Sequence, residues 1–101
     1  MTARQHLQRA VRIDGNYFYS RLGLSYISMN QGEFNKTITH ATRSFELFPT
    51  VEAVYFMARG NDGAGNVDKA LEYYRVVEKN DPQGKMGQQA AARIAALGGT
   101  K

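Results

Sequence analysis

The stretch that decides the fold is VEAVYFMARGNDGAGNVDKALEYYRVVEKNDPQG, residues 51–84. Small, apolar and turn residues occupy regular places in it, and parts of the same pattern recur before and after it at offsets of 33 to 35 residues. The earlier members of the recurrence are Gly32, Phe34, Ala41, Ser44 and Pro49, and the later members are Gly65, Val67, Tyr74, Val77 and Pro82. A period of this length is typical of stacked helical hairpins.

Helical spacing of apolar residues dominates the rest of the chain, and turn residues interrupt it at short intervals. The spacing predicts helices over about 2–13, 18–29, 33–48, 51–61, 67–79 and 86–97. Short helices joined by short turns pack as antiparallel neighbours. We therefore predict an all-α fold of about six antiparallel helices.

The 101 residues are enough for one small domain. The repeat divides it into a lone second helix of a partial repeat (1–15), one repeat (16–50), a second repeat (51–84) and a terminal capping helix (85–101). Half-repeats at both ends favour a fragment of a larger protein.

Composition excludes several classes of function. The chain has no cysteine, so disulfides and thiol chemistry are excluded, while cytoplasmic and periplasmic locations both stay open. The net charge of +4 comes from basic residues that are dispersed along the chain, so we do not expect nucleic-acid binding. No apolar run approaches the roughly 20 residues that span a bilayer, so membrane insertion is not expected either.

Residues 51–84 resemble a tetratricopeptide repeat, the helical-hairpin repeat of many protein-binding modules. The residues that carry the resemblance are Ala58, Gly65, Ala70, Tyr74 and Pro82. Ala58 and Ala70 would let two helix backbones approach, and Gly65 and Pro82 would set the turns. The resemblance implies a right-handed superhelix. The Ala/Arg-rich last helix, followed by Leu-Gly-Gly, is also similar to the tetratricopeptide tails of bacterial zinc metalloproteases.

The helix over 18–29 can be aligned with the repeat in two ways. Uniform spacing places Ser25 at the small position that Ala58 holds, with Arg21, Leu24 and Ser28 as its buried companions. Placing Gly23 there instead buries Tyr19, Leu22 and Tyr26, a more apolar stripe. We predict the Gly23 alignment on that ground, with two extra residues near Asn30-Gln31 and a shortened turn at Gly15-Asn16.

In this family the first helix of each hairpin lines a concave groove that holds a peptide. The groove positions carried over to this chain are Tyr17, Ser20, Leu24 and Ile27, with Arg21 adjacent, then Glu52, Tyr55, Arg59 and Asp62, and finally Met86, Gln89, Arg93 and Ala96. The candidate site residues are Tyr17, Arg21, Glu52, Tyr55, Arg59, Gln89 and Arg93. Arg59 and Arg93 over a tyrosine suit an acidic extended peptide or a terminal carboxylate.

The sequence contains no residue pattern that is typical of a catalytic, metal-binding or phosphate-binding site. His6 and His40 recur with the repeat, and no cysteine or carboxylate spacing completes a metal site with them. The acidic residues Asp62, Asp68, Glu72 and Glu78 have the spacing of solvated charges. The glycines of residues 60–65 lack the Lys-Ser/Thr of a phosphate loop, so we expect them to relax the turn.

The sequence thus predicts a protein- or peptide-binding module that is not an enzyme and uses no cofactor. One alternative is an accessory domain that positions or gates a zinc metalloprotease domain on the same chain. Another is a homo-oligomerisation domain, in which the exposed terminal helices associate weakly with each other.

Overall fold

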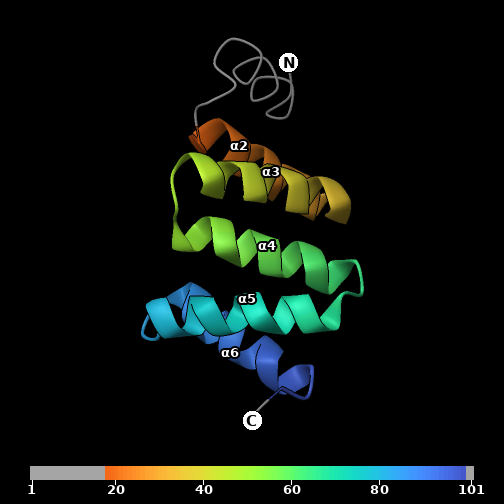
Figure 1. Ribbon diagram of the computed structural model, residues 1–101. Coiled ribbons are helices and arrows are strands. Elements are labelled where there is room, and N and C mark those ends of the chain that lie inside the picture. The colour runs from red at the N-terminus through yellow and green to blue at the C-terminus, as the bar shows by residue number, and fades with distance from the viewer. Residues whose placement is uncertain (1–17, 100–101) are drawn as a thin grey trace.

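The computed structural model describes residues 18–99, and every regular element in that range is an α-helix (Figure 1). The helices are α2 (Phe18–Asn30), α3 (Phe34–Leu47), α4 (Val51–Gly63), α5 (Val67–Asn80) and α6 (Lys85–Ala96). Their ends lie within two residues of the predicted ones, which confirms the all-α class. The helix predicted over 2–13 lies outside the described residues.

Each helix packs against the next one along the chain, so that α2 to α6 follow one another along a stack (Figure 1). In addition, the backbones of α2 and α4, and those of α4 and α6, approach each other closely, whereas those of α3 and α5 stay farther apart. The side of the stack that carries α2, α4 and α6 is therefore more closely packed than the side that carries α3 and α5. We call it the α2–α4–α6 face.

The helices α2, α4 and α6 end in the same way, at a spacing of 33 residues. A glycine with a positive φ follows each helix, namely Gly32 (74°), Gly65 (85°) and Gly98 (80°). The amide that follows each glycine donates to a carbonyl five residues back, from Glu33 to Ser28, from Asn66 to Asn61 and from Gly99 to Ile94, each at 2.8 Å. Glycine suits these turns because it adopts the left-handed conformation without strain.

This uniform spacing shows that the predicted alignment of α2 is wrong. Tyr19 and Tyr26, predicted to be buried, are 58% and 53% exposed, whereas Ser25 is fully buried. Leu24 and Ser28 are also buried, as the Ser25 alignment requires. The serines tolerate burial because their hydroxyls are small and find partners: Ser25 Oγ donates to the carbonyl of Thr37 at 3.2 Å.

The core lies between α4, α5 and α6. Its buried members are Val54, Tyr55, Ala58, Ala70, Tyr74, Val77, Ala90 and Ile94. Ala58 and Ala70 are completely buried, in agreement with their predicted role as small residues between two helix backbones. Within residues 18–99, no helix is long and apolar enough to cross a membrane.

The glycine-rich segment at the end of α4 serves packing as well as the turn. A Cβ on Gly60 would lie 2.7 Å from Ile38 Cγ1, and one on Gly63 would overlap the ring of Phe34. Both glycines lie inside α4, where they let α3 approach closely. Only Gly65 has the turn role expected for the whole segment.

Candidate functional site

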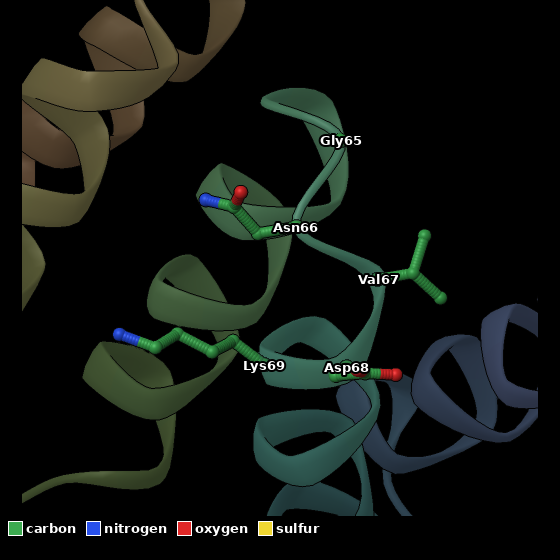
Figure 2. Close-up of a pocket in the computed structure, with 5 residues that line it drawn as sticks. All are labelled: Gly65, Asn66, Val67, Asp68 and Lys69. Atoms are coloured by element: carbon green, nitrogen blue, oxygen red, sulfur yellow. The ribbon is translucent and has the colours of Figure 1, made fainter.

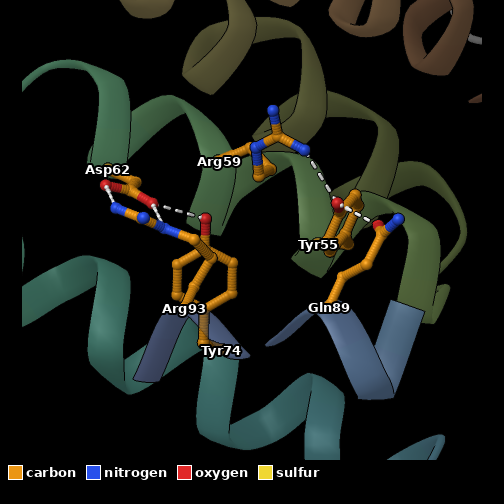
Figure 3. Close-up of polar contacts among 6 residues, drawn as sticks. All are labelled: Tyr55, Arg59, Asp62, Tyr74, Gln89 and Arg93. Carbon is orange, nitrogen blue, oxygen red and sulfur yellow. Dashed lines mark hydrogen bonds and ion pairs between the residues drawn. The ribbon is translucent and has the colours of Figure 1, made fainter. Parts of the chain in front are cut away.

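An open hollow of about 480 Å³ lies between α4 and α6 on the α2–α4–α6 face (Figure 3). Its lining consists of Tyr55, Arg59, Asp62, Gly63, Gln89, Ala92 and Arg93. Four of these, Tyr55, Arg59, Gln89 and Arg93, are candidate site residues from the sequence. The structure therefore brings together four of the five candidate residues that α4 and α6 carry, all except Glu52.

Asp62 is the centre of a polar cluster on one side of the hollow. Arg93 of α6 donates to both carboxylate oxygens, from Nε to Oδ2 at 2.7 Å and from Nη2 to Oδ1 at 2.9 Å. The hydroxyl of Tyr74, from α5, donates to Oδ2 at 2.8 Å. Asp62 thus joins three helices through one carboxylate.

The pKa values follow from these contacts. Partial burial raises the pKa of Asp62, but the hydrogen bonds from Arg93 and Tyr74 and the nearby charges of Arg93 and Arg59 outweigh that effect and lower it. Burial, and then the hydrogen bond to Asp62, raises the pKa of Tyr74 well above its usual range. Asp62 is therefore a paired carboxylate, and the prediction that it is a solvated charge is wrong.

Tyr55, Arg59 and Gln89 form a second chain of contacts in the hollow (Figure 3). The hydroxyl of Tyr55 donates to Gln89 Oε1 at 2.6 Å and accepts from Arg59 Nη1 at 2.8 Å. The guanidinium carbon of Arg59 lies 5.6 Å from the centre of the Tyr55 ring, within the range of a cation–π contact. Tyr55, predicted to line a peptide-binding groove, is only 6% exposed.

Several N–H groups that line the hollow have no hydrogen-bond acceptor within residues 18–99. Both oxygens of Asp62 and the amide oxygen of Gln89 already accept hydrogen bonds. Arg59 has five N–H donors, of which its contacts with the described residues use one, and it forms no ion pair with any of them. The Gln89 amide nitrogen is also uncommitted within residues 18–99. The hollow is thus rich in donors and carries one cation without a paired carboxylate.

Arg93 and Arg59 differ in their charge partners, although both were predicted as ligand-binding cations. The carboxylate of Asp62 balances the positive charge of Arg93 in an ion pair, and the hydrogen bonds to that carboxylate raise the pKa of Arg93. Arg93 therefore connects α6 to α4, whereas Arg59 forms no ion pair with any residue of 18–99.

The remaining candidate residues lie elsewhere. Glu52 is exposed in the first turn of α4. Arg21 Nη1 lies 3.4 Å from His40 Nδ1, and Arg21 Nε is buried without a hydrogen-bond partner, so this guanidinium is directed toward α3 rather than the hollow. Of the other groove positions predicted on α2, Ser20 and Leu24 are buried and Ile27 is half-buried, while Tyr17 lies outside the described residues.

With the corrected alignment, the α2 positions equivalent to Glu52, Tyr55, Arg59 and Asp62 are Tyr19, Leu22, Tyr26 and Met29. The ring of Tyr26 meets Phe56 of α4 edge-on at 6.0 Å, and Phe56 in turn lies 5.7 Å from Tyr55. The prediction missed these α2 residues because it assigned the tyrosines to the core. The signal that identifies them is the exact recurrence of Gly32 at Gly65.

A second hollow lies at the start of α5, where residues 65–69 form the lining (Figure 2). Figure 2 shows Asn66 and Lys69 extending to one side and Val67 and Asp68 to the other, so their side chains do not converge on a common point. Within residues 18–99, no three histidine, cysteine or acidic side chains gather as metal ligands would.

Neither family models nor curated protein sequences match this chain.

Proposed function

We propose that the chain is a tetratricopeptide-like module that binds an acidic peptide or a terminal carboxylate in the hollow between α4 and α6. The observation that carries this proposal is the donor surplus at Arg59. A carboxylate that enters the hollow meets free N–H groups of Arg59 and Gln89, and it meets no unpaired acceptor from Asp62.

The arrangement of the helices supports a groove on this side. Because α2, α4 and α6 touch along one side while α3 and α5 stay apart, a longer array of such hairpins would curve toward the α2–α4–α6 face. The inner side of such a curve is where helical-repeat proteins hold extended peptides. The hollow lies on that side.

A library of random peptides of about twelve residues, displayed on phage and selected on the immobilised protein, tests this function. We expect acidic peptides to be enriched and to lose about tenfold or more in affinity for Arg59→Gln, because a charge-assisted hydrogen bond is lost. Lys79→Gln is the matched control, since it removes one positive charge from the exposed surface of α5.

The selected peptides should bind Lys79→Gln as they bind the unaltered protein. Enriched peptides that bind Arg59→Gln with unchanged affinity would place the site elsewhere. Failure to enrich any peptide would count against the module's proposed role.

A further inference from the structure

The α2–α4–α6 face differs in polarity between its two ends. At the α6 end it carries Arg59, Asp62 and Arg93, which together hold one net positive charge, and Glu52 adds one negative charge in the first turn of α4. At the α2 end the equivalent row is Tyr19, Leu22, Tyr26 and Met29, which has no charged member. The one cation of α2, Arg21, is directed toward His40 of α3. The face therefore has a donor-rich half and an apolar half.

The two halves meet at neighbouring equivalent positions. Tyr26 stands in α2 where Arg59 stands in α4, and its half-exposed ring lies against Phe56 of α4. Phe56 also lies 5.7 Å from Tyr55, whose hydroxyl accepts the Arg59 hydrogen bond. An aromatic path of Tyr26, Phe56 and Tyr55 thus joins the apolar half to the cation.

Resting on the proposed function, we propose that the partner is an extended peptide with two anchors: a carboxylate at Arg59 and an aromatic or long aliphatic side chain against Tyr26 and Phe56. Packed helices lie ~10 Å apart, and an extended chain rises ~3.3 Å per residue, so the two anchors stand about three residues apart in the peptide. Charge complementarity to Arg59 and the apolar surface beside it define this chemistry.

The charges of the face favour a peptide over a nucleic acid. Nucleic-acid binding draws its affinity from several cations that contact successive phosphates. Here Arg93 is paired with Asp62, and Glu52 adds an exposed negative charge to α4, so Arg59 alone is available among the residues of the α4–α6 hollow. One cation beside an apolar surface fits one carboxylate and one apolar side chain.

A synthetic peptide array tests the spacing. Each peptide has a single Glu in a Ser/Gly/Ala background and a single Phe placed at every position on either side of it. We expect binding to the unaltered protein to peak when Phe stands about three residues from Glu, on one side or the other. Tyr26→Ser should abolish this peak while leaving a weaker, position-independent binding of the Glu peptides. Arg59→Gln should abolish binding of the whole array.

Val76→Ser is the matched control, since Val76 is an exposed apolar residue of α5, outside the face. It should leave the peak unchanged. Binding that depends on Arg59 but not on the position of Phe, or a peak that survives Tyr26→Ser, would overturn the two-anchor proposal while the proposed function stands. If neither the array nor the random library shows any binding that depends on Arg59, the two-anchor proposal and the proposed function are both wrong.

A labelled oligouridine supplies the last arm of the test. We expect that any weak binding of the oligouridine to the unaltered protein is unchanged in Arg59→Gln. If the oligouridine binds as tightly as the best peptide and Arg59→Gln abolishes that binding, the face is a single-stranded nucleic-acid surface and the peptide proposal is wrong.

Discussion

Replacing Asp62 tests whether its carboxylate holds α6 against α4. The carboxylate accepts two hydrogen bonds from Arg93 and one from Tyr74. In Asp62→Asn, the amide oxygen can still accept from Tyr74, but the charge that pairs with Arg93 is gone. In Asp62→Ala, the Tyr74 hydroxyl also loses its acceptor. The two variants therefore separate the ion pair from the buried hydrogen bond.

The magnitude depends on the exposure of each partner. A hydrogen bond to a charged group contributes about 1.5–3 kcal/mol when shielded, and an exposed ion pair about 0.2–1 kcal/mol. The Asp62 side chain is 14% exposed and that of Arg93 43%, so the solvent screens the pair strongly. Asp62 also lies in the last turn of α4, where the helix dipole disfavours a negative charge by about 0.3–1 kcal/mol.

We therefore expect Asp62→Asn to lower the free energy of unfolding by about 1 kcal/mol, because loss of the pair outweighs relief at the helix end. Asp62→Ala should lower it by about 2–3 kcal/mol, because the fully buried Tyr74 is left with an unsatisfied hydroxyl. Urea unfolding at neutral pH, followed by circular dichroism, measures both. A double-mutant cycle that combines Asp62→Asn with Arg93→Gln should give a coupling free energy of about 1 kcal/mol between the two side chains.

The effect should depend on pH in a defined direction. The folded-state pKa of Asp62 lies below its ordinary value of 3.8, so its stabilising effect is complete above that value. The effect is lost as the pH falls through the folded-state pKa, and the unaltered protein and Asp62→Asn should then converge in stability. An Asn variant as stable as the unaltered protein at neutral pH, or an Ala variant no less stable than Asn, would refute the assignment.

Three further substitutions test the packing, each measured by urea unfolding. Thr50→Ala should lower the free energy of unfolding by about 1 kcal/mol, because Thr50 Oγ1 caps α4 by accepting from the amide of Ala53 at 3.1 Å. An unchanged free energy of unfolding would show that this hydrogen bond does not stabilise the helix. Gly60→Ala should destabilise by about 1 kcal/mol although alanine favours helix, because its Cβ would crowd α3; a gain in stability would show that α3 yields easily. Gly87→Ala should cost about 2–3 kcal/mol, because its Cβ would overlap the backbone carbonyl of Asp81; a loss under 1 kcal/mol would contradict that close approach.

The candidate site was only partly predictable. The resemblance to tetratricopeptide repeats led us to expect Tyr55, Arg59, Gln89 and Arg93 on one face, and the structure brings these four together in the hollow. It could not distinguish Arg59 from Arg93, because the difference comes from Asp62, which is 31 residues from Arg93 in the chain. An aspartate in the last turn of a helix was the one local signal, since that position is unfavourable without a cationic partner.

Within residues 18–99, the sequence by itself determined the helices and, to within two residues, their ends. Glycine at a left-handed turn and proline after a helix act through the local backbone, so Gly32, Gly65 and Pro49 mark boundaries whatever surrounds them. The tertiary structure decided between the two alignments of α2 that the sequence left open. Hydrophobicity favoured burial of Tyr19 and Tyr26, but close packing of α2 on α3 favours the small serines, and the Ser25 hydroxyl donates to the carbonyl of Thr37 there. Burial and ion pairing depend on which distant residues meet, and local sequence does not contain that information.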